Sequence, residues 1–438
     1  MKDKPVSIYN ADCLEGLPDI ESGTIDLVAT DPPYGIGFMG KDWDKALPDK
    51  RVWAECLRVL KPGAFAFVMC IPRQDCLAHM IVNLGEAGFE TGFTSMYWTY
   101  ASGFPKAGNI GKQVDKRNGG EREVIGQKEC GYQVSISKKR HEEGYRPNLT
   151  NATKLVDITA PSTPEAKALD GSYAGFQPKP AVEVILVAMK PLSKKTYVDQ
   201  ALDNGKGITW LDDCRIPYES EPNLTNERYK YNINNSQNEI YNKKGDLPPQ
   251  EMRTQGRFPA NLLVSDDVLN DGKVTKSSGG KSGHTGAYGG GYKEEYYKGA
   301  NPGLGDSGSF SRYFDLDKWY NKTFPFLITP KASKSEKNKG CEDLPLGEPP
   351  ASARSKPAEG RQSPLGKPRA NSHPTVKPLK LMSYLITLGS REGDTVVDPY
   401  VGSGSTCLAA SMLGRKSIGY ETDKGYFEIA VERNNKSV

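Results

Sequence analysis

The sequence contains little that could build a metal centre or a disulfide framework. Its eight cysteines include no C-x-x-C pair and lie mostly in apolar segments, and its 438 residues include only four histidines. Cysteines used in this way are typical of reduced thiols in the cytosol, and the pattern disfavours a zinc site and a disulfide-stapled secreted domain. We therefore expect a cytoplasmic protein without a bound metal.

Long apolar segments are also missing. No apolar run approaches the roughly 18 residues that a membrane-spanning helix needs, and the first residues, MKDKPVSIYNAD, lack the apolar core of a signal peptide. The hydrophobic fraction is only 37%, while 46 glycines and 31 prolines supply many turns. This composition predicts a soluble, compact core that carries long irregular insertions, with no membrane partner.

A large excess of charge of one sign is absent from the chain as a whole, but charge is unevenly distributed. The net charge of +4 is too small to indicate a nucleic-acid partner. Residues 331–380 nevertheless hold eleven Lys and Arg against five Asp and Glu, and residues 105–160 hold eleven against seven. Local excesses of this kind suit the phosphate backbone of a nucleic acid, and they equally suit a solvated surface loop.

Alternating strands and helices are predicted at both ends of the chain, in the rhythm typical of a parallel sheet covered by helices on both faces. Between the ends the sequence is polar and rich in glycine, and the Gly- and Tyr-rich tract 276–311 is predicted to be a loop. We expect both ends to build one sheet, with the middle inserted as a separate lobe. The expected strands are 6–9, 24–30, 64–70, 94–100, 181–188, 394–397 and 416–420, and the expected helices are 52–60, 74–87, 379–388, 404–413 and 425–434.

The strongest motif is D-P-P-Y-G at residues 31–35, directly after the second predicted strand. A carboxylate at the carboxyl end of a parallel strand lies where open α/β sheets bind ligands. Asp31 and the carbonyl of Pro32 offer acceptors for the two N–H groups of an amine on a base, and Pro33 helps to stiffen the turn. Tyr34 offers a flat face that could clamp a base flipped out of its helix. An ordinary Asp-Pro turn is the simpler alternative, and it accounts for less of the motif.

A second motif, D-P-Y-V-G-S-G-S-T at residues 398–406, lies between a predicted strand and a predicted helix. Glycines in such a turn let the backbone approach a ligand, and the N-terminus of the helix favours negative charge. Glu421 ends the next predicted strand 23 residues after Asp398, a spacing at which an acidic residue can accept hydrogen bonds from ribose hydroxyls. This loop alone would also suit a dinucleotide enzyme, although it departs from G-x-G-x-x-G. An oxidoreductase would leave D-P-P-Y-G unexplained.

Together with H-P-T-V-K-P at residues 373–378, the two motifs resemble those of the DNA amino-methyltransferases, which act on adenine N6 or cytosine N4. Their order, with D-P-P-Y before the cofactor loop, resembles the circularly permuted beta group of that family. Stretches such as IYNADCLEGLP, KPAVEVILVAMKPL and GRFPANLLV are similar to phage and prophage members. The resemblance covers residues 1–105 and 320–438 well and is patchy between them.

The resemblance implies a Rossmann-like, S-adenosylmethionine-dependent methyltransferase sheet of the α/β class, assembled from both ends of the chain, with an irregular inserted recognition lobe. The middle is the candidate DNA reader because its Asn, Lys, Arg and Tyr suit base edges, phosphates and stacking. The implied parts are a catalytic half at 1–104, a basic insertion at 105–180, a further core strand at 181–190, a target recognition region at 191–330 and a cofactor-binding half at 331–438.

The resemblance also implies roles for single residues. Catalysis is expected from the D-P-P-Y set, which is Asp31, Pro32, Pro33 and Tyr34. The N-terminal motif is expected at the adenine end of the cofactor, the glycine-rich loop at its methionine part, and the acidic residue of the later strand at its ribose. The residues expected to bind S-adenosylmethionine are therefore Asp12, Cys13, Asp31, Lys377, Asp398, Pro399, Gly402, Gly404, Thr406 and Glu421.

The implied chemistry is a direct, in-line methyl transfer from a sulfonium to a base amine, without a covalent intermediate. Methylation of cytosine at carbon 5 needs an attacking thiolate, and the Pro-Cys dipeptide typical of that class is absent from the sequence. Adenine N6 is the expected target because cytosine-N4 members often carry Ser where Asp31 stands, and cytosine N4 stays the alternative. Methyltransferases of RNA or protein would more often show Asn at this position.

The expected partner is double-stranded DNA, inside a bacterial or phage-infected cell. Members of the group often pair into dimers, so a homodimer stays open as a further partner, as does a cognate restriction endonuclease. No target sequence can be inferred from the residues of the middle region.

Overall fold

The computed structural model describes residues 5–36, 44, 46–100, 108–135, 149–176, 178, 181–218, 256–276, 307–324, 338, 340–341, 344, 371, 373 and 375–436. The chain divides into two compact units, one made of Met1–Ala101 with Ala181–Val438 and the other of Ser102–Pro180. Most of the tract 276–311 and most of the basic stretch 331–380 lie outside the described residues.

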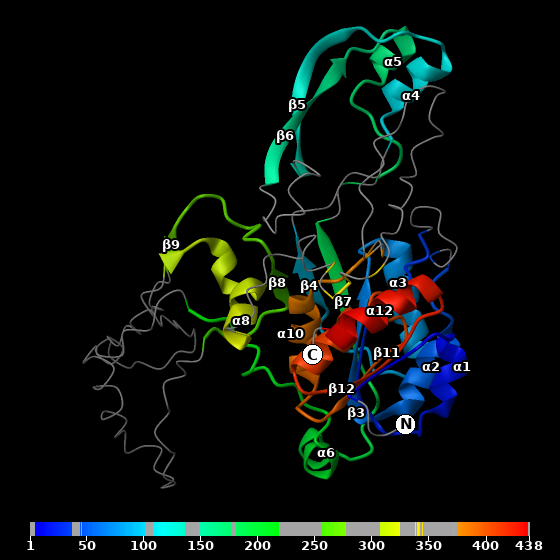
Figure 1. Cartoon of the computed structure of the whole chain (residues 1–438), viewed down its shortest axis with the longest axis vertical. Helices are drawn as coiled ribbons and strands as arrows, with labels where there is room; N and C mark the ends of the chain where they lie inside the picture. The colour runs from blue at the N-terminus through cyan, green and yellow to red at the C-terminus, as the bar shows by residue number, and fades with distance from the viewer. Residues whose placement is uncertain are drawn as a thin grey trace, which may run out of the picture. The chain divides into compact units, whose positions relative to one another are not determined.

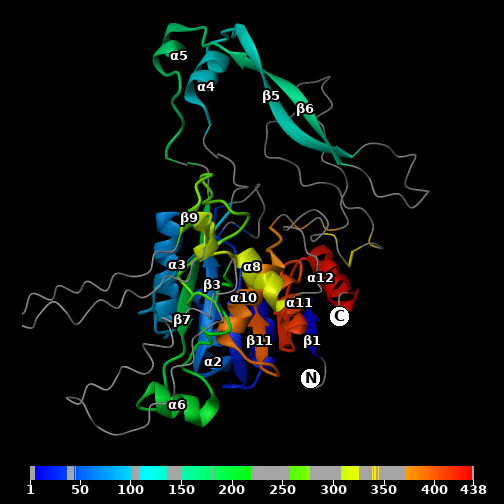
Figure 2. The same ribbon diagram turned by 90° about the vertical axis from the view of Figure 1, so that its left-hand side faces the viewer.

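The larger unit is built on one sheet that joins the two ends of the sequence. The N-terminal strand pairs in parallel with a strand near residue 420, and D-P-P-Y follows a strand that pairs in parallel with the one before Asp398. The blue and the orange-to-red segments accordingly lie side by side in both views (Figures 1 and 2). The prediction of a Rossmann-like α/β sheet assembled from both ends is confirmed. Its strands, in spatial order, are β1 (Val6–Tyr9), β12 (Lys416–Tyr420), β11 (Thr395–Asp398), β2 (Ile25–Thr30), β3 (Leu60–Cys70), β7 (Val182–Met189), β4 (Met96–Thr99) and β8 (Leu262–Val264).

The sheet is mixed, so the expectation of an all-parallel sheet is wrong for one strand. β7 runs antiparallel to both of its neighbours, β3 and β4. The reason lies in the connection: Thr99 of β4 pairs with Val182 of β7, and the N–H of Tyr100 donates to the carbonyl of Ala181 at 3.0 Å. The chain therefore reverses direction as in a hairpin, with the smaller unit inserted at the turn.

Several helices of the larger unit begin where short polar side chains satisfy the first free N–H groups. The side chains of Asp49, Thr196 and Asp315, for example, each accept a hydrogen bond from an N–H in the first turn of the helix that follows. The helices are α1 (Cys13–Gly16), α2 (Lys50–Val59), α3 (Gln74–Glu86), α6 (Tyr197–Asn204), α8 (Leu316–Thr323), α10 (Leu379–Gly389), α11 (Ser405–Met412) and α12 (Lys424–Lys436), with the 3-10 turns η1 (Leu17–Asp19) and η6 (Phe310–Tyr313).

Both faces of the sheet are covered, because alternate residues of its buried strands point to opposite faces. Leu27 and Phe67 belong to a core that includes α8, α10 and α11, whereas Val28 and Val68 belong to a core that includes α2 and α3. This burial explains why the central strands read as nearly continuous apolar runs. None of the helices in the described part of the chain combines the length and the apolar character that a bilayer crossing requires.

The smaller unit contains α4 (Ile110–Arg117), α5 (Pro164–Ala168) and the antiparallel strands β5 (Val124–Ser135) and β6 (Leu149–Thr159). Its helices meet at the buried Asp115, whose carboxylate accepts hydrogen bonds from the backbone N–H groups of Ser162 and Thr163 and from Arg122. The sequence indicated only a polar, irregular insertion here, and the two-stranded ribbon was not anticipated.

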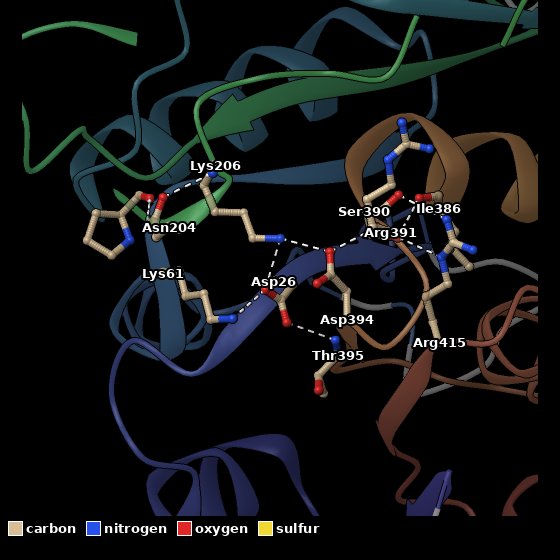
Figure 3. A network of polar contacts seen from close by, with 11 residues as sticks. Asp26, Lys61, Asn204, Lys206, Ile386, Ser390, Arg391, Asp394, Thr395 and Arg415 are labelled. Carbon is tan, nitrogen blue, oxygen red and sulfur yellow. Dashed lines mark hydrogen bonds and ion pairs between the residues drawn. The ribbon is translucent and has the colours of Figure 1, made fainter. Parts of the chain in front are cut away.

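A polar network ties together the amino ends of the central strands (Figure 3). Asp26, the second residue of β2, accepts contacts from Lys61 at 2.6 Å, Lys206 at 2.9 Å and the N–H of Thr395 at 2.9 Å. Lys206 also reaches Asp394, which precedes β11, at 2.8 Å. Burial alone would raise the pKa of Asp26, but its hydrogen bonds and the two ammonium groups lower that pKa below its ordinary value. The network therefore holds β2, β3 and β11 together at their amino ends, which lie at the edge of the sheet opposite their carboxyl ends.

Candidate active site

A cavity of about 370 Å³ opens where β1, β2, β11 and β12 end. Parallel strands present their carboxyl ends at a single edge, so residues distant in sequence meet there. Both halves of the sequence contribute to its wall. Among the residues predicted for the site, those lining the cavity are Asp12, Cys13, Asp31, Pro33, Lys377, Asp398, Pro399, Gly402, Thr406 and Glu421.

Three predicted residues lie beside the cavity wall instead. Pro32 is buried and Tyr34 is half-buried behind Asp31. Gly404 lies at the start of α11 with φ of +82°, and a Cβ there would come within 2.5 Å of the side-chain amide of Asn434. In this structure Gly404 therefore allows α11 to pack closely against α12.

The D-P-P-Y turn is held by a carboxylate that the sequence did not reveal. Asp44 accepts hydrogen bonds from the backbone N–H groups of Tyr34 at 2.7 Å and of Gly35 at 3.0 Å. The Tyr34 hydroxyl donates to Asp31 Oδ1 at 2.5 Å. Burial and the neighbouring Asp31 carboxylate raise the pKa of Tyr34 well above its ordinary value, so the phenol stays protonated and keeps donating.

Lys377 brings a positive charge to the same carboxylate. Its Nζ lies 3.1 Å from Asp31 Oδ1 and 2.9 Å from Glu183 Oε2, and it lies 5.7 Å from the centre of the Tyr34 ring. Burial alone would lower the pKa of Lys377, but the two carboxylates raise it above its ordinary value. Glu183 was missed in the sequence, where its signal was one acidic residue in the apolar stretch AVEVILVA.

Asp398 uses its carboxylate to hold the glycine-rich loop. It accepts hydrogen bonds from the hydroxyls of Thr30 at 2.6 Å and Thr406 at 2.5 Å, and from the N–H of Tyr400 at 3.0 Å. Burial nevertheless raises the pKa of Asp398 to about 6. The loop that connects β11 with α11 is thus fixed to the end of β2.

Glu421 follows directly on β12 and also lines the cavity. It accepts a hydrogen bond from the N–H of Asp423 at 2.8 Å, and burial raises its pKa to about 7. Gly402 lies directly beside His373 in the cavity lining: its φ is +53°, and a Cβ would lie 2.8 Å from His373 Nε2. The His373 ring is itself packed edge-on against Tyr426, with centroids 4.4 Å apart.

The N-terminal motif closes the cavity from the side of α1. Asp12 caps this short helix by accepting a hydrogen bond from the N–H of Leu14 at 2.8 Å. The Cys13 thiol is buried, and burial raises its pKa to about 12, which leaves it a neutral, apolar part of the wall. Asp12 therefore has a capping role as well as its place in the cavity lining.

Comparison with known proteins identifies similar sequences. The model of the N6_N4_Mtase family, described as DNA methylase, matches residues 25–432. The Type II methyltransferase M2.DpnII of Streptococcus pneumoniae is 45% identical over 64 residues, which are 15% of this chain and 24% of that protein. The Type II methyltransferase M.HindIII of Haemophilus influenzae is 51% identical over 61 residues, which are 14% and 20%. The aligned residues thus span no more than about a quarter of the length of these curated relatives.

Comparison with solved structures also gives matches. The M1.HpyAVI complex with S-adenosylmethionine is 15% identical, with a TM-score of 0.38 over 98% of this chain and 99% of that chain. The cytosine-N4-specific PvuII DNA methyltransferase is 14% identical, with a TM-score of 0.40 over 98% of this chain and 86% of that chain.

Proposed function

We propose that this chain, which belongs to the N6_N4_Mtase family of DNA methylases, is a site-specific methyltransferase that transfers a methyl group from S-adenosylmethionine to the N6 amine of a flipped-out adenine in DNA. One observation carries the proposal: the carboxylates of Asp31, Asp398 and Glu421 line the same cavity. A base amine held at Asp31 and a cofactor held near Glu421 would meet inside the same cavity.

The donor set of the cavity fits S-adenosylmethionine. A volume of about 370 Å³ lies within the usual range for small-molecule pockets. Glu421 offers acceptors for ribose hydroxyls, and the buried Cys13 offers an apolar surface for a purine. At Gly402 a side chain would collide with His373, so a glycine keeps this part of the cradle open.

When bound, S-adenosylmethionine supplies a methyl group on a positively charged sulfur. The residues of the chain prepare the acceptor. Asp31 and the carbonyl of Pro32 accept the two N–H groups of the amine, which draws the nitrogen lone pair out of the ring and towards the methyl group. The two prolines keep these acceptors fixed, and Tyr34 supplies the aromatic face against which the base stacks.

We also propose the target base and the region that recognises the DNA sequence. Asp31 at the head of the motif favours adenine over cytosine, and the order of the motifs supports the circularly permuted beta group. Residues 191–330 are our candidate for target recognition, because β8 pairs with β4 and ends beside it at the edge that carries the site. Double-stranded DNA would approach from this edge.

The test is nucleoside analysis by mass spectrometry of unmethylated DNA after incubation with the purified protein and isotope-labelled S-adenosylmethionine. Labelled N6-methyladenine is the expected product. We expect Asp31→Ala to lower the rate at least about 100-fold, the size of effect seen when one oriented polar group is removed from an active site. Asp75→Ala, which removes an exposed carboxylate on α3, serves as the control with unchanged rate.

Two results would change the proposal. Labelled N4-methylcytosine would keep the cofactor and the chemistry and replace the base. A protein that binds S-adenosylmethionine but leaves every DNA substrate unlabelled would contradict DNA methylation.

A further inference from the structure

The contacts of Lys377 are made with carboxylates of the chain itself. Its ammonium group lies between Asp31 and Glu183, at 3.1 and 2.9 Å, and its side chain is only 11% exposed. A lysine that bound the carboxylate of the cofactor's methionine part would be expected to point away from other acids. In this structure Asp31, which follows β2, and Glu183 of β7 already hold its ammonium group.

Glu183 reaches the site because of the direction of its strand. β7 is antiparallel to β3, and Val184 pairs with Cys70, the last residue of β3. The first residues of β7 therefore lie at the edge where β2 and β3 end. In a parallel strand Glu183 would lie at the opposite edge, near the network of Asp26 and Lys206.

The two donors of Asp31 bind the same oxygen. Tyr34 donates from its hydroxyl to Oδ1 at 2.5 Å, and Lys377 Nζ lies 3.1 Å from that atom. Within the described part of the chain, Asp31 Oδ2 accepts no hydrogen bond. One oxygen of the carboxylate is thus immobilised, and the other stays available to an incoming N–H group.

We propose that Lys377 and Glu183 are positioning residues: Lys377 fixes Oδ1 of Asp31 so that Oδ2 receives the target amine, and Glu183 fixes Lys377. This inference rests on the proposed function, because it concerns the same methyl transfer. It replaces the expected role of Lys377 as a cofactor ligand. It also explains why an acidic residue interrupts an otherwise apolar core strand, where an unpaired carboxylate would be costly.

The experiment separates cofactor binding from transfer in the full-length protein. For Lys377→Met we expect the single-turnover methylation rate to fall about 100-fold, the order of loss that a misplaced reacting group produces. The dissociation constant for S-adenosylmethionine, measured by calorimetry, should change less than about threefold, because Lys377 does not hold the cofactor. Lys377→Arg should recover part of the rate, since a guanidinium can bridge two carboxylates.

Glu183→Gln is the second arm, and it keeps the shape of the side chain. We expect roughly a tenfold loss of rate, within the coupling range of residues in contact, again with little change in cofactor affinity. Because Glu183 acts through Lys377, the double variant should be no slower than Lys377→Met alone. Glu90→Gln, an exposed carboxylate of the same unit, is the matched control.

Several outcomes would overturn the inference. An intact rate for Lys377→Met would overturn the positioning role. A large loss of cofactor affinity with a normal rate at saturation would return Lys377 to the cofactor. Additive losses in the double variant would show that Glu183 acts independently. If Lys377→Met does not fold, as judged by thermal melting, Glu183→Gln decides alone. A wild-type protein that leaves DNA unlabelled would instead contradict the proposed function.

Discussion

At the scale of single residues, two carboxyl groups in the cavity wall have pKa values close to neutrality. Burial raises the pKa of Glu421 to about 7 and that of Asp398 to about 6. Three donors already bind the carboxylate of Asp398, so this carboxylate serves to hold the glycine-rich loop. Glu421 accepts hydrogen bonds from backbone N–H groups, among them that of Asp423, and lines the cavity. Its titration is therefore the one that a cofactor with hydroxyl groups and a positive charge would sense.

We expect the affinity for S-adenosylmethionine to fall as the pH drops through about 7. In the proposed site the ionised carboxylate of Glu421 would accept hydrogen bonds from the ribose and attract the sulfonium, so below its pKa each pH unit should cost up to about tenfold in affinity. Calorimetric titrations between pH 5.5 and 8.5 measure this dependence. Glu421→Gln should bind more weakly at pH 8 and lose most of the dependence, whereas Glu15→Gln, on the exposed side of α1, should behave as the wild type.

The raised pKa of Glu421 makes the stability of the unliganded protein depend on pH in the opposite direction to its affinity for the cofactor. Between the ordinary pKa of 4.5 and about 7, the folded protein holds a proton on Glu421 that the unfolded chain has released. The contribution of this group to stability therefore declines as the pH rises through that window.

If Glu421→Gln kept the wild-type pH dependence of cofactor affinity, a group other than Glu421 would have to titrate.

At the scale of elements, the amino ends of β2 and β11 are joined by the buried ammonium group of Lys206. We expect Lys206→Met to lower the free energy of unfolding by about 3 kcal/mol, because it leaves the carboxylates of Asp26 and Asp394 close together without the shared cation. Urea denaturation measures the loss. Lys194→Met removes an ion pair with Asp203 in which both side chains are more than 40% exposed, and it should cost less than about 1 kcal/mol.

Equal losses in the two variants would show that burial does not distinguish these ion pairs. Cofactor affinity provides a further check, since the network lies at the edge of the sheet away from the cavity. Lys206→Met that remains folded should therefore bind S-adenosylmethionine normally.

The elements that the sequence predicted are those with a strong local signal. Buried central strands such as β2 and β3 are mostly apolar. Asp31 directly follows β2, and Asp398 is the last residue of β11. The ribbon β5–β6 was missed because its strands are rich in charged and polar residues and its stability depends on pairing across the chain. The direction of β7 was also missed, since apolar composition does not specify parallel or antiparallel pairing.

The same limit explains which site residues were found. Asp31, Asp398 and Glu421 are placed by the strand immediately before them, so local sequence was sufficient. Glu183 reaches the site only because β7 is antiparallel, and Asp44 only because the chain returns to the D-P-P-Y turn. The positions of such residues in the site depend on tertiary structure, and no short sequence motif predicts them.

At the scale of the whole molecule, the smaller unit is inserted at the tip of the β4–β7 hairpin. Because Tyr100 and Ala181 are hydrogen-bonded neighbours at 3.0 Å, the 80 residues between them can be exchanged for a two-residue turn. We expect a chain with Asn-Gly in place of residues 101–180 to fold and to bind S-adenosylmethionine within about threefold of the wild type. Circular dichroism and calorimetry test this.

A shortened chain that folds but no longer binds the cofactor would show that the insertion supports the cavity. A chain that binds the cofactor but methylates DNA slowly would instead assign the insertion to the DNA substrate. Replacing the same residues with a longer Gly-Ser linker controls for strain in the turn.

The pairing of β1 with β12, and of β2 with β11, also has a consequence for synthesis on the ribosome. Leu27 lies opposite Val396, and Val6 lies opposite Ser417, so the first strands emerge long before their partners exist. At roughly 5–20 residues per second, they wait on the order of tens of seconds with an unpaired edge. The cavity assembles only after translation has passed residue 421, so an interrupted message yields a chain that lacks the cavity.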